Sequence, residues 1–364
     1  MKKLNRQKLI CIPYDYSKNK IHHTLIILFC FITTFSFGQN TDSIQKNRLH
    51  IMNQIAAKVK NHYIFKDIAI QTDSLLRQKN IQDKFALLDN KDFAKQLTTY
   101  LKSVTKDKHF FIKYIGNTQV NSKVPNDKEQ QKIYNYLNSL ENYGFESVKR
   151  LEGNIGYINY KGFAEPKSSE IAMAAAMNFV ANTNSLIIDL RENKGGDGNT
   201  LLQFCSYFFK VKTKLYDTYF RNTDHSTEDW TKNKVLGLKY LNKPIYILTS
   251  GTTFSAGEGL SYFLQSYNLA KVIGEQTGGA ANPVDHFIID NQFLVLIPSG
   301  KITATLTKNS WEQLGVTPDI IVSKEKAFTN TYCMALNELL KNSSKTELKE
   351  EEIRELIKSL EKDL

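Results

Sequence analysis

The 364-residue sequence has little cysteine, and it has no long apolar run after its N-terminal region. Its four cysteines form neither a Cys-x-x-Cys pair nor a His/Cys ligand spacing, which disfavours a zinc site. Internal repeats, the Gly-Lys-Ser/Thr ending of a P-loop and the G-x-G-x-x-G fingerprint are also missing. Basic and aromatic residues share no cluster, so nucleic-acid binding is not expected despite a formal charge of +11. The 41% of hydrophobic residues is normal for a globular protein.

The N-terminal region has the composition of a secretory signal peptide. Residues 1–23 are polar and basic, and the apolar run that follows, Thr24 to Phe37, is shorter than the ~20 residues that span a bilayer. Cleavage near Gly38 would remove six basic residues and one acidic residue, which lowers the formal charge from +11 to +6. We expect residues 1–38 to be a signal peptide and the protein to be exported, periplasmic or secreted. An uncleaved membrane anchor is the alternative.

Two cysteines, Cys205 and Cys333, follow the predicted signal peptide. In an oxidising compartment they can form one disulfide. Both occur in apolar helical segments, where buried free thiols fit the pattern equally well. The sequence leaves the two alternatives open.

The hydrophobic periodicity changes near residue 153. Before it, apolar residues recur at helical spacing over 44–107, followed by a short strand at 110–112 and a polar connection over 119–129. After it, continuously apolar strands alternate with helices, which is typical of a sheet covered on both faces. The predicted strands are 155–160, 186–190, 245–248, 272–274 and 293–297, and the predicted helices are 169–182, 200–211 and 255–267. We expect an α/β fold with an N-terminal helical subdomain (39–107), a central domain (108–324) and a C-terminal helical tail (325–364).

Ser255 lies where a predicted strand runs through a tight turn into a helix. A hydroxyl at such a helix start can act as a nucleophile, and the N–H of Ala256 can donate to a developing oxyanion. However, Ser255-Ala-Gly-Glu258 also matches the S-x-x-E capping box, and the spacing alone favours the cap. The two interpretations are compatible with each other.

Two further strand ends lead into glycine turns at the edge of the sheet where α/β ligand sites form. The segment from Asp189 to Gly198 contains Gly195 and Gly196. Its backbone N–H groups can face an oxyanion or a phosphate, although an ordinary turn has the same composition. The segment 274–280 is the second turn. Together with the turn at Ser255, these two strand ends indicate a functional site at one edge of the sheet.

A serine nucleophile needs a base, and a neutral imidazole serves at neutral pH. Five histidines follow the predicted signal peptide, namely His50, His62, His109, His225 and His286. We expect His50, His62 and His225 at the surface, because their neighbours are polar. His109 lies at the junction of the helical region and the first strand, and His286, after the second glycine turn, is the runner-up.

Six segments in order along residues 107–320 resemble the serine peptidases of the tail-specific (C-terminal-processing) and tricorn family, and most of all its bacterial interphotoreceptor-retinoid-binding-protein-like branch. They are Asp107-x-His109, Gly153-Asn154-Ile155-Gly156-Tyr157, Asp189-Leu190-Arg191 with Gly195-Gly196, Thr253-Phe254-Ser255-Ala256-x-Glu258, Gly274-Glu275-x-Thr277-Gly278-Gly279-Ala280, and Trp311-Glu312-x-Leu314-Gly315-Val316-x-Pro318-Asp319-Ile320. Each segment is modest alone, and the six in register are a strong signal.

The resemblance implies a crotonase/ClpP-like core over 108–324 and peptide-bond hydrolysis through an acyl-enzyme. It assigns Ser255 as the nucleophile, His109 as the base and Glu312 as the acid that holds the imidazole. It further implies oxyanion donors at Gly195 or Gly196 and at Ala256, and substrate contacts at Gly278, Gly279 and Ala280.

The sequence departs from the family pattern at three places. Tail-specific proteases use a Ser/Lys dyad, but their lysine position corresponds to Ala280 here, so a Ser/His/Glu arrangement is expected. Roughly 40 residues separate His109 from Gly153, too few for the usual PDZ domain. Lys194 stands where a glycine is common, beside the predicted oxyanion turn.

We therefore expect an exported serine peptidase whose partner is a peptide or protein substrate, without a cofactor or a metal. The alternative is a binding protein on the same fold that carries apolar, retinoid-like or lipid-like ligands without turnover. An inert secreted scaffold is a third and weaker hypothesis.

Overall fold

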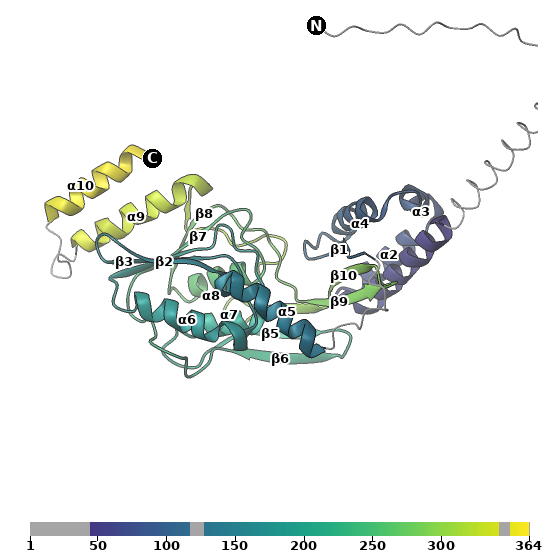
Figure 1. Cartoon of the computed structure of the whole chain (residues 1–364), viewed down its shortest axis with the longest axis horizontal. Helices are drawn as coiled ribbons and strands as arrows, with labels where there is room; N and C mark the ends of the chain where they lie inside the picture. The colour runs from purple at the N-terminus through teal and green to yellow at the C-terminus, as the bar shows by residue number, and fades with distance from the viewer. Residues whose placement is uncertain (1–43, 117–126, 342–349, 364) are drawn as a thin grey trace, which may run out of the picture.

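The computed structural model of the chain describes residues 44–116, 127–341 and 350–363. The predicted signal peptide lies outside these residues, as does most of the polar connection predicted over 119–129. The chain forms two lobes, an N-terminal helical lobe (purple to blue in Figure 1) and a larger lobe. Within the described ranges, no helix combines the length and the apolar character needed to cross a bilayer.

A six-stranded mixed sheet forms the centre of the larger lobe. Its order is β12-β8-β7-β4-β3-β2, with the edge strand β2 antiparallel and the others parallel. The strands are β2 (Phe145–Leu151), β3 (Ile155–Tyr160), β4 (Ser185–Asp189), β7 (Ile245–Thr249), β8 (Lys271–Gly274) and β12 (Ile320–Ile321). Every residue of β4 and β7 is buried, as expected for strands covered on both faces. The predicted α/β class is confirmed.

Helices cover both faces of this sheet (Figure 1). One layer consists of α6 (Pro166–Val180), α7 (Gly198–Cys205) and α8 (Ala256–Ser266), and the other consists of α9 (Lys324–Lys341) and α10 (Glu350–Leu360). Along β4, Ile188 packs with the first layer and Ile187 with the second. The segment predicted as a C-terminal tail is thus a layer of the fold, because its apolar residues cover a sheet face that would otherwise meet water.

The two cysteines lie in different layers. Cys205 belongs to the core under α6, α7 and α8, whereas Cys333 belongs to the core under α9 and α10. Both are buried free thiols, and burial raises the pKa of each. Of the two alternatives that the sequence leaves open, the structure contains the free thiols.

The N-terminal lobe combines helices with a small sheet formed by distant parts of the chain. A helix over 44–62 is followed by α2 (Lys66–Leu76), α3 (Lys79–Phe85) and α4 (Asn90–Thr105). The sheet has the order β1-β10-β9, with β1 (Phe111–Tyr114), β9 (Val284–Ile289) and β10 (Phe293–Pro298). Phe93 and Leu97 share one core with Phe293 and Val295. The lobe is therefore completed by a hairpin that the central domain contributes.

A third sheet, with the order β11-β5-β6, flanks the larger lobe. Its strands are β5 (Lys214–Phe220), β6 (His225–Trp230) and β11 (Gly300–Ala304). The sequence analysis did not predict these strands. For β6 the reason is that every residue except Trp230 is polar and none is buried. The predicted helix 200–211 ends earlier, at Cys205. Along the chain, α5 (Asp127–Leu140) and a short 3-10 turn (Asn142–Gly144) precede β2.

Candidate active site

Ser255 forms a strained elbow between β7 and α8. Its backbone has φ 53° and ψ −119°, a conformation that residues other than glycine rarely adopt. Such strain costs about 1–3 kcal/mol, and it concentrates at functional sites. A sharp strand-to-helix turn of this kind lifts a nucleophile above the edge of the sheet. Ser255 is half-buried, and it borders a cavity of about 280 Å³.

The elbow is held by the buried carboxylate of Glu258. Its Oε2 accepts from the N–H of Ser255 at 2.8 Å and of Ala280 at 2.9 Å, and its Oε1 accepts from the N–H of Gly279 and the hydroxyl of Thr277, both at 2.6 Å. Burial raises the pKa of Glu258, and these hydrogen bonds oppose the shift. The Ser255-to-Glu258 half of the predicted capping box is therefore present. It also ties the elbow to the second glycine turn.

The first glycine turn passes directly beside Ser255. A Cβ on Gly195 would lie 2.6 Å from the Cβ of Ser255, so only glycine allows this approach. The N–H of Gly195 donates to Asn193 Oδ1 at 2.8 Å, whereas Gly196 lines the cavity together with Ser255 and Ala256. Gly196 is thus the better placed of the two predicted donors. Lys194 is exposed, and its ammonium donates to the carbonyl of Thr252 at 3.4 Å.

His109 comes from the N-terminal lobe, three residues after the left-handed C-cap of α4 at Lys106 (φ 60°). The N–H of His109 donates to Asp107 Oδ1 at 3.0 Å. Its ring packs edge-on against Phe254, the residue before Ser255, with 5.0 Å between the ring centroids. Desolvation, with a smaller contribution from the nearby Lys102, lowers the pKa of His109 to about 4. The imidazole is therefore neutral at physiological pH.

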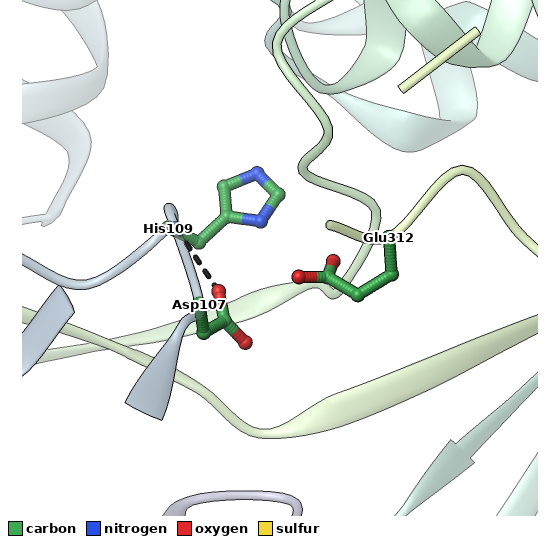
Figure 2. Close-up of side chains that lie close together, drawn as sticks. All are labelled: Asp107, His109 and Glu312. Carbon is green, nitrogen blue, oxygen red and sulfur yellow. Dashed lines mark hydrogen bonds between the residues drawn. The ribbon is translucent and has the colours of Figure 1, made fainter. Parts of the chain in front are cut away.

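Glu312 faces His109 from the loop that follows β11. Its Oε2 accepts from the N–H of Ala281 at 2.7 Å and of Asn282 at 3.1 Å. Figure 2 shows its carboxylate directed toward His109 and Asp107, and one side-chain atom from each of the three lies within 4.8 Å of the others. Desolvation and then repulsion by Asp107 raise the pKa of Glu312 to about 7.

Two atoms of this cluster are buried without a hydrogen-bond partner among the described residues, His109 Nδ1 and Glu312 Oε1. The other carboxylate oxygens are hydrogen-bonded, since Asp107 Oδ1 accepts from His109 N–H and Asp107 Oδ2 accepts from Asn282 Nδ2. An imidazole and two carboxylates can also bind a metal ion. The carboxylate oxygens other than Glu312 Oε1 already accept hydrogen bonds, so a metal ion would compete with those donors. A mutual contact would satisfy both unpartnered atoms, His109 Nδ1 and Glu312 Oε1.

The residues predicted to contact substrate, Gly278 to Ala280, are not among the residues that line this cavity. Gly279 and Ala280 donate to Glu258, Gly278 donates to the carbonyl of Thr253 at 2.9 Å, and Trp311 Nε1 donates to the carbonyl of Ala280 at 2.8 Å. Ala280 is fully buried. The cavity wall here consists instead of Ala281 and Pro283.

The other four histidines lie outside this arrangement. His286, the runner-up, is exposed on β9, and His225 is exposed at the start of β6. His50 contacts Gln54, and His62 packs on Phe287. The sequence reasoning missed the second role of Glu258 and the role of Asp107 as an acceptor. The Asp107-x-His109 spacing was the available signal for the latter, since an Asp side chain often accepts from the N–H two residues on.

Two protein-family models match the chain. Residues 154–322 match peptidase family S41, and residues 40–144 match the N-terminal domain of Peptidase_S41 in eukaryotic IRBP. The first match contains Ser255, Glu258 and Glu312, and the second contains Asp107 and His109.

Relatives and solved structures agree with these matches. The carboxyl-terminal-processing protease of Synechocystis sp. is 25% identical over 171 residues, which are 47% of this chain and 38% of that protein. The chain spans about two fifths of the length of the curated relatives it matches. A lipoprotein from Streptococcus agalactiae has a TM-score of 0.52 at 14% identity, over 80% of this chain and 96% of that one. The tricorn protease has a TM-score of 0.50 at 12% identity, over 87% and 37%. These two structural likenesses show the fold.

Proposed function

We propose that this chain, which carries a peptidase family S41 domain preceded by the N-terminal domain of that family, is a serine peptidase that acts through an acyl-enzyme. The observation that carries the proposal is the strained elbow at Ser255, with Gly196 and Ala256 beside one cavity. A strained, non-glycine residue at a strand-to-helix turn has a cost that a capping role alone does not require, since serine caps helices without left-handed strain.

In the proposed first step, Ser255 Oγ attacks the carbonyl carbon of the substrate while His109 accepts the hydroxyl proton. The carbonyl oxygen becomes an oxyanion, which the N–H groups of Gly196 and Ala256 stabilise. Glu312 holds the ring orientation and stabilises the imidazolium through the two unpartnered atoms, Nδ1 and Oε1. His109 then protonates the leaving amine, so the C–N bond breaks and the acyl group stays on Ser255.

In the second step, water attacks the acyl-enzyme carbonyl, and His109 takes a proton from that water. The tetrahedral intermediate collapses, the proton passes to Ser255 Oγ, and the carboxylic product leaves. Because the pKa of His109 is lowered, the imidazole is unprotonated before each attack and can accept the proton. The packing of His109 against Phe254 supports its placement beside the nucleophile.

Export belongs to the same proposal. The basic N-terminal region and the short apolar run Thr24 to Phe37 support a signal peptide over 1–38, and hence a peptidase that meets peptides in the periplasm or outside the cell. The alternative of an apolar-ligand carrier has less support. The cavity beside Ser255 is lined in part by the carboxyl of Asp229 and the hydroxyls of Thr218 and Thr227, which suit an apolar ligand poorly.

The proposal is tested with a fluorophosphonate probe, which forms a covalent bond only with an activated serine. We expect the full chain to be labelled with or without a chelator, and Ser255→Ala to lose the labelling while it keeps its circular-dichroism spectrum. A Ser250→Ala variant is the matched control, since Ser250 lies on the same turn but donates to the carbonyl of Arg191. An unlabelled native protein, or labelling that persists in Ser255→Ala, overturns the assignment.

A further inference from the structure

The cavity beside Ser255 separates the elbow from the third sheet. One wall consists of Gly196, Ser255 and Ala256, and the opposite wall is the inner face of β11-β5-β6. His109 is not among its lining residues. The cavity therefore adjoins the attacked carbonyl and the proposed oxyanion donors, on a side that the proton-transferring imidazole does not occupy.

The strand register brings a defined set of side chains to that inner face. Tyr216 pairs with Asp229 across β5 and β6, and Thr218 pairs with Thr227. Residues two apart on a strand point to the same face, so all four face the cavity, which they line. Ile302, opposite Thr218 on β11, adds an apolar contact.

Among the described residues that line this cavity, Asp229 is the one with a charged side chain. The hydroxyls of Thr218 and Thr227 both donate to its Oδ2, at 2.8 and 3.3 Å. Its Oδ1 accepts no hydrogen bond from the described residues, and Asp229 takes part in none of the ion pairs among them. The nearby Lys214 pairs instead with Asp217 and Glu228. The carboxylate is thus oriented through one oxygen, and the other is left for a donor from the cavity.

We infer that this cavity receives the side chain of the residue whose carbonyl Ser255 attacks, and that Asp229 selects lysine or arginine there. The inference rests on the proposed peptidase function. Tyr216, Leu201 and Ile302 would contact the aliphatic stem, and Asp229 Oδ1 would accept from the ammonium or guanidinium group. About 280 Å³ accommodates one long side chain.

The half-buried state of Asp229 decides between a cation and an apolar side chain. Because Asp229 is half-buried, its charge is only partly solvated, and burial raises the pKa of this carboxyl. An apolar side chain in the cavity would remove the remaining water and leave the charge unpaired, whereas a cation replaces that water with a charge-assisted hydrogen bond. The site therefore discriminates against the apolar residue as well as attracting the basic one.

The experiment compares fluorogenic peptides that differ only at the residue before the cleaved bond, with lysine, arginine, norleucine or leucine there. For the native protein we expect kcat/KM for lysine and arginine to exceed that for norleucine by about 100-fold. Asp229→Asn should lose most of this preference, mainly because its kcat/KM for the lysine and arginine peptides falls. Asp217→Asn is the matched control, because it removes a neighbouring charge of the same sheet that does not line the cavity.

Fluorophosphonate labelling of each protein separates the two proposals. If native protein and Asp229→Asn are both labelled but the native protein cleaves the norleucine peptide as well as the lysine peptide, the assignment of the cavity is wrong and the peptidase proposal stands. If Asp229→Asn lowers kcat/KM equally for basic and apolar peptides, the assignment of the cavity is also wrong. Failure of the native protein to be labelled overturns both.

Discussion

On the serine side of the site, Ser255, Glu258 and the second glycine turn all belong to the larger lobe, and both oxygens of Glu258 are occupied by hydrogen bonds. On the histidine side, His109 comes from the N-terminal lobe and Glu312 from the larger one. There, one oxygen of the acid and one nitrogen of the imidazole are buried without partners among the described residues.

This difference in hydrogen bonding indicates that the two sides have different physical roles. A carboxylate with four donors holds a strained backbone in place and needs nothing from the substrate. A buried imidazole nitrogen and a buried carboxylate oxygen without hydrogen-bond partners destabilise the resting protein. A hydrogen bond between them becomes more favourable when His109 acquires a positive charge during the proposed reaction. In the proposed mechanism, the serine side is preorganised in the resting protein, and the histidine side is completed only when the imidazolium forms.

The largest effect is expected from Glu312→Gln. We predict that kcat/KM falls about 10³-fold, because an amide cannot stabilise the imidazolium. The pKa of Glu312 is raised to about 7, so its required anion forms as pH rises through 7, and native activity should rise over the same range. His109, whose pKa is lowered to about 4, is neutral across this pH range and does not contribute to the change in activity near pH 7. The pH profile of kcat/KM checks both points.

Glu312→Gln should also move the remaining acid limb to lower pH, toward the range set by His109. Its free energy of unfolding at pH 8 should equal or exceed that of the native protein, because the amide oxygen can still accept from Ala281 and Asn282 and a buried charge is removed. If kcat/KM of Glu312→Gln still rises near pH 7, a group other than Glu312 causes that rise. This result would contradict the proposed contact between Glu312 and His109.

The matched substitution on the serine side is Glu258→Gln. Both carboxylate oxygens accept two hydrogen bonds each, so an amide nitrogen in either place faces two donors. We predict that the free energy of unfolding falls by about 3 kcal/mol, measured by urea denaturation. Equal stability of the two glutamine variants would remove the distinction between the sides.

Local signals predicted the serine side, and long-range pairing hid much of the rest. The apolar run of β7 and the S-x-x-E spacing lie within about ten residues of Ser255, and the glycines at 195 and 196 are read within the short segment that follows β4. Asn282 and Asp107, which hydrogen-bond beside His109, lie 175 residues apart. Periodicity carries no information on such a contact, and the resemblance to a known family was needed to pair His109 with Glu312.

The third sheet was missed for a different reason. Strand β6 has polar residues on both faces, because one face meets solvent and the other lines a cavity rather than a core. A hydrophobic alternation is therefore absent where the specificity of the site is built. The C-terminal helices show the converse case. Their apolar stripe was visible in the sequence, and the sheet face that it covers was not.

The smallest effect, and the most direct test of strain, is expected from Ser255→Gly. Glycine adopts φ 53° without a Cβ clash, which relieves about 1–3 kcal/mol, while its greater freedom in the unfolded chain costs up to ~1 kcal/mol. We predict a net gain in the free energy of unfolding of about 1 kcal/mol over Ser255→Ala, which keeps the Cβ. Ser261→Gly, in the middle of α8, is the control and should lose about 1 kcal/mol relative to Ser261→Ala. If Ser255→Gly is destabilised as much as the control, the elbow stores no strain. The serine side would then be held no more tightly than an ordinary helix start, and its contrast with the histidine side would rest on Glu258 alone.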